Sequence, residues 1–133
     1  MIVRQLTRLE ASDPTFLPLV LRAHGFPFLD AEWCWVVEHE DKTIALIVCS
    51  FAHGMLVLWR ILATPDAKRV CRSWFFRALP IVLDNARQRG CVGYLTMLED
   101  HHPACVKLAR IVARTGGVLI PFVGTLGAAL IQP

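Results

Sequence analysis

Residues 59–76, WRILATPDAKRVCRSWFF, contain the clearest indication of fold in this sequence. It runs from an apolar strand, through a short basic turn that contains a proline, into an apolar helix. The free N–H groups and the dipole at a helix N-terminus favour anions, so such turns often bind phosphate. They usually carry glycines, which let the backbone approach the ligand, and this turn has none. The stretch therefore predicts a strand–helix unit and leaves open whether its turn still holds phosphate.

The composition indicates one globular domain, residues 1–133, with no membrane span. Of the 133 residues, 55% are hydrophobic and 19% are charged, which argues against a disordered chain. The most apolar segment, residues 118–131, is too short to cross a bilayer. The five cysteines are odd in number and scattered, which is typical of reduced, buried thiols. We therefore expect a cytoplasmic protein.

The sequence gives little support for nucleic-acid binding, which ranks third among the functions considered below. The net charge of +3 is mild, and the four tryptophans are not interleaved with basic residues on one surface. Their positions are more typical of a core or an interface.

Residues 1–64 predict a strand, a helix and three further strands. Residues 1–7 alternate weakly, and Ser12 or Asp13 can cap a helix that Gly25 ends. Residues 33–64 divide into three antiparallel strands at tight turns near residues 40–42 and 52–54. The middle strand is almost continuously apolar, as expected when helices cover both faces of a sheet.

Residues 70–131 predict two helices that alternate with strands. Helical periodicity covers residues 70–89, where Pro80 should bend the helix, and residues 99–117. Strands are expected at residues 91–98, 118–123 and 125–131. Strand–helix–strand units require right-handed crossovers and parallel pairing. The predicted fold class is α/β, a mixed sheet of about seven strands with helices on both faces.

The segment EDHHPAC, residues 99–105, has the residue types for acid–base chemistry where a strand ends and a helix begins. Glu99 or His101 has the chemistry of a base that deprotonates an amine. Capping of the following helix by Glu99 and Asp100 explains the acidic residues equally well. A zinc site needs three or four ligands, and no second ligand pair is visible, so no metal is predicted.

The order of these elements resembles the GNAT acyltransferase fold over nearly the whole chain. The resemblance implies transfer of an acetyl group from acetyl-CoA to a small-molecule or protein amine by direct attack. It implies that backbone groups near Leu62 and Ala63 contact the pantetheine arm of acyl-CoA. It also implies that the strands near Leu58 and Leu95 are parallel neighbours that separate at their C-terminal ends.

The turn motif of that fold spans six residues. It has Gln or Arg at the first position, Gly at the fourth, and Gly or Ala at the sixth. It falls on residues 68–73, where Lys68 keeps a positive charge, and Cys71 and Ser73 replace the two small residues. A Cβ on Cys71 limits how closely a pyrophosphate approaches, which Lys68, Arg69 and Arg72 can offset by direct charge contacts. The resemblance thus assigns the cofactor to Leu62, Ala63, Lys68, Arg69, Cys71, Arg72 and Ser73.

The proton donor of the GNAT fold is missing from its usual place. Many members carry a tyrosine on the last long helix, and here Val112 stands at that position. The only tyrosine, Tyr94, lies on a predicted strand. Cys105, His101 or a water would have to substitute for it.

A second resemblance is to the GNAT-like internal virion protein of short-tailed phages, whose turn also lacks glycines and is rich in Lys and Arg. The segments that resemble it are VLWR (residues 57–60), the basic turn, and ARTGGVL (residues 113–119). It implies a non-catalytic phage virion or assembly protein as the alternative function. The apolar segment from Val118 to Ile131 is the predicted contact for a homo-oligomer or larger assembly.

Overall fold

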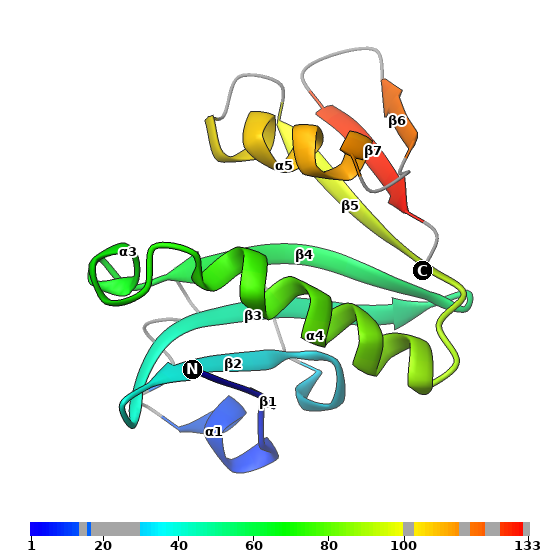
Figure 1. Cartoon of the computed structure of the whole chain (residues 1–133). Helices are drawn as coiled ribbons and strands as arrows, with labels where there is room; N and C mark the ends of the chain where they lie inside the picture. Colours follow the sequence, from blue (N-terminus) through cyan, green and yellow to red (C-terminus); the bar gives the residue numbers. More distant parts are fainter. Residues whose placement is uncertain (14–15, 17–29, 100–102, 115–117, 122–125, 132–133) are drawn as a thin grey trace.

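The computed structural model describes residues 1–13, 16, 30–99, 103–114, 118–121 and 126–131 (Figure 1). The helix predicted between Ser12 and Gly25 lies mostly outside these residues. The candidate base His101 also lies outside the described residues.

Seven strands within the described residues form one mixed sheet, in the order β1-β2-β3-β4-β5-β7-β6. β1 to β4 pair antiparallel, β4 and β5 pair parallel, and β7 pairs antiparallel with both β5 and β6. The predicted fold class is confirmed, although β7 inserts between β5 and β6, so only one crossover joins adjacent strands. The strands are β1 (Ile2–Gln5), β2 (Trp35–His39), β3 (Lys42–Ala52), β4 (Met55–Ala63), β5 (Gly93–Glu99), β6 (Val118–Pro121) and β7 (Leu126–Ile131).

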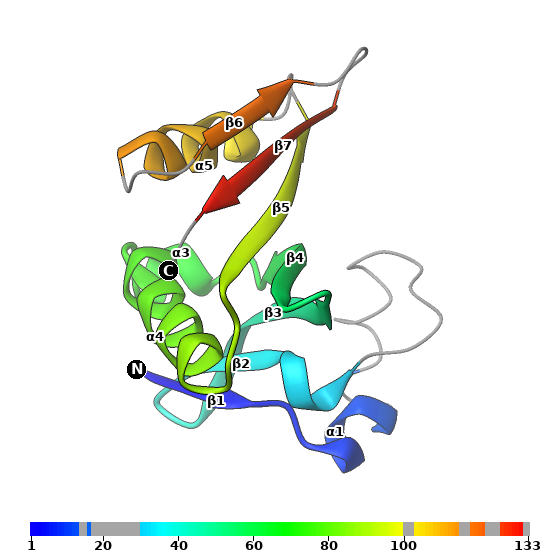
Figure 2. The same cartoon turned by 90° about the vertical axis from the view of Figure 1, so that its right-hand side faces the viewer.

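Helices lie on both faces of the sheet. α4 and α5 cover one face and α1 lies against the other, as the two views show (Figures 1 and 2). The helical segments are α1 (Arg8–Ser12), the 3-10 helix η1 (Ala31–Trp33), α3 (Ala67–Val70), α4 (Trp74–Gln88) and α5 (Pro103–Arg114).

β3 separates two apolar cores, which explains its continuous apolar sequence. Ile47 and Cys49 pack under α4 with Trp35 of β2. Leu46 and Val48 face the other way, into a smaller cluster that includes Leu6 and Ala11 on the α1 side. The prediction that both faces of this strand are covered is therefore confirmed.

Both predicted hairpin turns form, and each uses two residues with positive φ. Glu40 and Asp41 have φ of 48° and 61°, and His53 and Gly54 have φ of 53° and 77°. Positive φ at both central positions gives the turn twist that suits paired antiparallel strands. His53 therefore serves as a hairpin residue.

The helix predicted over residues 70–89 begins only at Trp74, and a separate short helix, α3, precedes it. α3 ends at Val70, Cys71 adopts an extended conformation with φ −150° and ψ 96°, and α4 begins at Trp74. Val70, the first residue of the predicted helix, is 39% exposed. α4 continues through Pro80 and buries Trp74, Ala78, Leu79, Val82 and Ala86.

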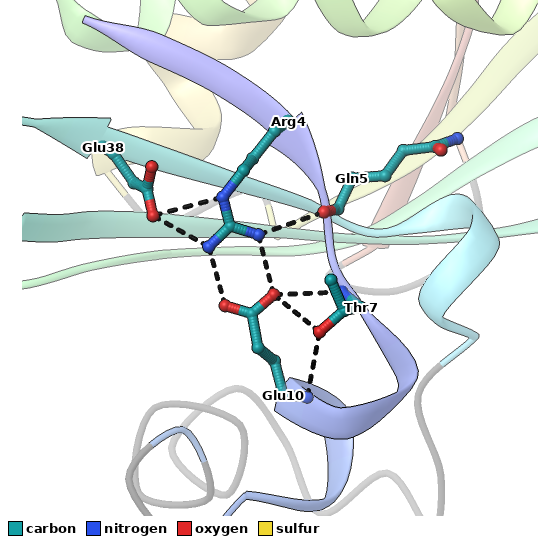
Figure 3. A network of polar contacts seen from close by, with 5 residues as sticks. All are labelled: Arg4, Gln5, Thr7, Glu10 and Glu38. Atoms are coloured by element: carbon teal, nitrogen blue, oxygen red, sulfur yellow. Dashed lines mark hydrogen bonds and ion pairs between the residues drawn. The ribbon is translucent and has the colours of Figure 1, made fainter. Parts of the chain in front are cut away.

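A network of hydrogen bonds and ion pairs, which was not predicted from the sequence, holds α1 in place. Thr7 and Glu10 form a capping box, in which each side chain accepts a hydrogen bond from the backbone N–H of the other residue. Arg4 binds the Glu10 carboxylate through two hydrogen bonds of 2.7 Å and also contacts Glu38 of β2 (Figure 3). The pattern Thr-x-x-Glu is the sequence signal that predicts this helix start.

Candidate functional site

β4 and β5 separate part-way along their length. They pair only where Met55 to Leu58 faces Gly93 to Thr96, and beyond that rung β4 runs on to Ala63 and β5 to Glu99. Figure 1 shows the two strands diverging toward α3 and α5. The predicted separation is confirmed, and we call the space between residues 59–63 and residues 97–99 the β4–β5 opening.

A buried hydroxyl closes the narrow end of the β4–β5 opening. Thr96 is 6% exposed, and its Oγ1 donates a hydrogen bond of 3.2 Å to the carbonyl oxygen of Leu58. This bond fixes the last rung that the two strands share.

β4 carries an extra residue immediately after that rung. Cys49 pairs with Leu58 and Val48 pairs with Arg60, so Trp59 is the additional residue of a β-bulge. A bulge bends its strand and increases the local twist. Because the bulge lies where β4 leaves β5, it helps to turn β4 away from its neighbour.

The backbone of β4 presents hydrogen-bonding groups to the opening. The N–H of Thr64 donates to the carbonyl of Ile44 at 2.8 Å, on the β3 side. Backbone groups alternate sides along a paired strand, so Leu62 also turns toward β3, and Ile61 and Ala63 turn toward the opening. An extended ligand with amide groups can bind there as an added strand does. The alternation makes Ile61 a further candidate contact for the pantetheine arm, beside the predicted Leu62 and Ala63. The contact with Leu62 stays a prediction.

The basic turn lies at the end of β4. Lys68, Arg69, Arg72 and Ser73 are exposed, and Cys71 is partly buried. Arg69 forms an ion pair of 2.9 Å with Asp66, whereas Lys68 and Arg72 have no acidic partner among the described residues. Two cations therefore remain free to bind an anion.

The N-terminus of α4 adds backbone donors beside these cations. Within the described part of the chain, the amides of Arg72, Ser73, Phe75 and Phe76 have no hydrogen-bond acceptor, and the Ser73 side chain does not cap the helix. α4 runs from Trp74 to Gln88, long enough for its dipole to favour negative charge at this end. The turn thus combines unused N–H groups with free side-chain charges.

The backbone of the turn has no need of glycine. From Thr64 to Trp74, all of which is described, no residue has positive φ. Cys71 and Ser73 therefore adopt conformations open to any residue, and the missing glycines do not strain the turn. The remaining cost is steric, because the Cβ of Cys71 lies where glycine would leave room. The residues present fit a pyrophosphate, with side-chain charge compensating for a less open backbone.

The candidate base Glu99 is the last residue of β5, on the diverging arm of the opening, and its backbone is in register with Leu126. α5 begins at Pro103, a favourable first residue of a helix, and Glu99 belongs to the strand that precedes it. The alternative, in which Glu99 and Asp100 cap this helix, stays a prediction because Asp100 lies outside the described residues.

Tyr94 cannot replace the missing proton donor in the opening. It pairs with Leu56, before the last shared rung, and packs in the core beneath α4. Burial raises the pKa of its phenol above the usual value. Val112, at the position of the expected tyrosine, lies within α5.

Three of the cysteines are buried thiols, as predicted. Burial raises the pKa of Cys34 to about 11 and raises the pKa of Cys49 and Cys91 as well. Such thiols are poor nucleophiles because the reactive form is the thiolate. Cys71 differs, since it is only partly buried.

Neither metal ligation nor membrane insertion has support in the described part of the chain. No group of three or more His, Cys, Asp or Glu side chains there is placed to hold a metal ion. The helices found in those residues are too short or too polar to cross a membrane.

Solved structures similar to this chain are GNAT acetyltransferases. A CoA complex of an acetyltransferase from Bacillus subtilis matches with a TM-score of 0.73 and 8% identity, over 98% of this chain and 97% of that one. The IAA acetyltransferase of Bacillus cereus gives 0.70 and 9%, over 99% of each chain. The ribosomal-protein-alanine N-acetyltransferase of Brucella melitensis gives 0.68 and 17%, over 100% of this chain and 99% of that one.

These similarities extend over essentially the whole of each chain at low identity, so they establish the fold. No family model and no curated protein matches the sequence. The chain has the GNAT fold.

Proposed function

We propose that the protein is an acyl-CoA-dependent N-acyltransferase that transfers an acetyl group from acetyl-CoA to a small-molecule or protein amine. The observation that carries this proposal is the β4–β5 opening, where the backbone groups of Ile61 and Ala63 have no partner among the described strands. The free amides of α4 and the basic turn lie at the end of the same strand. CoA complexes among the similar structures support acyl-CoA as the ligand.

Ile61 and Ala63 would hold the amide groups of the pantetheine arm. Lys68, Arg72 and the α4 amides would hold the pyrophosphate, while Arg69 contributes less because it is paired with Asp66. Acetyl-CoA supplies an activated acetyl group, and the amine that attacks it must lose a proton. Glu99, at the end of β5, is the proposed acceptor of that proton, with His101 as the second candidate.

Isothermal calorimetry with acetyl-CoA, followed by detection of free thiol in the presence of mixed primary amines, tests the proposal. We expect saturable binding that weakens as salt rises, because the turn contacts phosphate through charge. Thiol release should depend on the added amine. Absence of acetyl-CoA binding at millimolar ligand would overturn the proposal.

A second function is favoured by one observation, that no tyrosine lies at the β4–β5 opening among the described residues. With Val112 on α5 and Tyr94 in the core, this fold would serve assembly without catalysis, as in a phage virion component. Acetyl-CoA binding without turnover, or no binding together with stable oligomers, would favour that alternative.

A further inference from the structure

Two adjacent residues of β4, Trp59 and Arg60, place their side chains on the face of the sheet opposite α4. Arg60 is in register with Val48, which packs with Leu46 in the cluster on the α1 side. Trp59 hydrogen-bonds Ser50, and Ser50 follows Val48 by two residues on β3, hence on the same face. The bulge thus places two consecutive side chains on one face, whereas in a regular strand they would lie on opposite faces.

These residues are the first of β4 beyond the rung shared with β5. They therefore lie at the narrow end of the β4–β5 opening. The basic turn leads into α4, which covers the other face. The phosphates of a ligand bound at the N-terminus of α4 would therefore lie on the opposite side of the sheet from the Trp59 and Arg60 side chains.

The Trp59 ring is held in place and still accessible. Its Nε1–H donates a hydrogen bond of 2.7 Å to Ser50 Oγ, and the residue is 42% exposed. A fixed, partly exposed indole offers a flat apolar surface at little entropic cost.

Arg60 is an exposed cation with no hydrogen bond or ion pair to any described residue. Several other arginines differ from Arg60, among them Arg4, Arg69 and Arg87, which each contact a carboxylate. A guanidinium without an acidic neighbour is suited to bind a carboxylate through two parallel hydrogen bonds.

We propose that Trp59 and Arg60 form the subsite that selects the acceptor, an amine that also carries a carboxylate. Its carboxylate would bind Arg60, and its apolar part would lie on the Trp59 ring. This inference rests on the proposed function and specifies its substrate class, which the similarity in fold does not.

L-phenylalanine and L-phenylalaninamide are suitable probes, since both have an amine and a ring and only the first has a carboxylate. Each would be titrated into ¹⁵N-labelled protein saturated with CoA, with the indole N–H signal of Trp59 as the readout. The Trp59→Phe variant identifies that signal. We expect phenylalanine to shift it at about tenfold lower concentration than the amide, as one charge-assisted contact implies.

Arg60→Ala should abolish the preference for phenylalanine, and Arg60→Lys should retain part of it. Arg87→Ala, on the far part of α4, is the matched control and should keep it in full. CoA affinity of Arg60→Ala, measured by calorimetry, should equal that of the wild type.

Equal response to both probes, or no response while CoA binds normally, would overturn the subsite and leave the proposed acyltransferase standing. Failure of the wild type to bind CoA would overturn both. The two failures are therefore distinguishable by the calorimetric measurement alone.

Discussion

The hydroxyl of Thr96 donates a hydrogen bond to the carbonyl of Leu58, 3.2 Å away, at the last rung that β4 and β5 share. Beyond this rung the two strands diverge, so the bond lies at the narrow end of the opening. Thr96 is buried, so solvent does not replace a hydrogen bond that is lost there. The pair therefore couples the stability of the sheet to the shape of the candidate site.

Replacing Thr96 by valine should lower the free energy of unfolding by about 1 kcal/mol. Valine keeps the shape of threonine, but the Leu58 carbonyl loses its side-chain donor, at a typical net cost of this size. Urea denaturation measures the change. Thr43→Val on β3 is the matched control and should change stability by less than about 0.5 kcal/mol, as is usual away from buried polar contacts. Equal effects at the two sites would contradict the role of the bond.

Replacing Lys68, Arg69 and Arg72 together by alanine should weaken CoA binding by at least about tenfold. Each charge-assisted phosphate contact contributes about 1.5–3 kcal/mol before screening by solvent, and the pairing of Arg69 with Asp66 reduces its share. Calorimetry at low salt is the measurement. A variant lacking Arg8, Arg87 and Arg114 removes the same charge elsewhere and should bind normally. Unchanged affinity in the first variant would place the cofactor somewhere else.

Cys71→Gly should increase CoA affinity by a few fold if the Cβ of Cys71 obstructs the pyrophosphate. Cys71→Ala keeps the Cβ and removes only the thiol, which accepts a 3.9 Å contact from Arg77, so it should bind like the wild type. The glycine variant should also be about 1 kcal/mol less stable, because glycine loses more backbone entropy on folding. If alanine and glycine give the same affinity, the backbone is not a phosphate contact.

Sequence patterns predicted the parts of this fold that depend on local chemistry. The apolar run of β3, the two tight turns and the strand–helix unit after Leu58 each have their own signal. The break between α3 and α4 has none, because Val70 and Trp74 keep helical spacing across it. The position of β7 between β5 and β6 depends on contacts between distant segments, which periodicity does not record.

Some parts of the candidate site could likewise be predicted from the sequence, and others could not. Basic residues and a helix start were visible in the chain, so the turn could be predicted. The bulge at Trp59 could not, since it is a shift in the register between β3 and β4, which the sequence of neither strand records. Without it, neither the shared face of Trp59 and Arg60 nor the orientation of Ile61 follows from the sequence.

Glu10→Gln should remove a stabilising contribution that is present at neutral pH and lost in acid. Arg4 and the Thr7 hydrogen bonds lower the pKa of the Glu10 carboxyl from 4.5 to about 2. A lowered folded-state pKa stabilises the fold above the unfolded pKa, and the stabilisation disappears as pH falls from about 5 to 2. After discounting for partial exposure, we expect a difference of about 1–2 kcal/mol at pH 7. Urea titrations at pH 7 and pH 3 should show the difference shrinking, and a constant difference would contradict it.

The C-terminal strands carry the last prediction, a homodimer or larger assembly. β6 pairs only with β7 and is the terminal strand of the sheet, so its outer edge has backbone groups without a partner among the described strands. Residues 118–131 are apolar at nearly every position, and an exposed, apolar edge strand favours pairing with a second chain.

Sedimentation of the protein at micromolar concentration should therefore show a species larger than a monomer. Lysine at both Leu119 and Ile120 should shift it toward monomer, because charges on an edge strand oppose pairing. Ile2→Lys on β1, the opposite edge, is the control and should leave the assembly intact. A monomeric wild type that turns over acetyl-CoA would remove the assembly hypothesis. An oligomer that does not bind the cofactor would favour assembly over catalysis as the function of this fold.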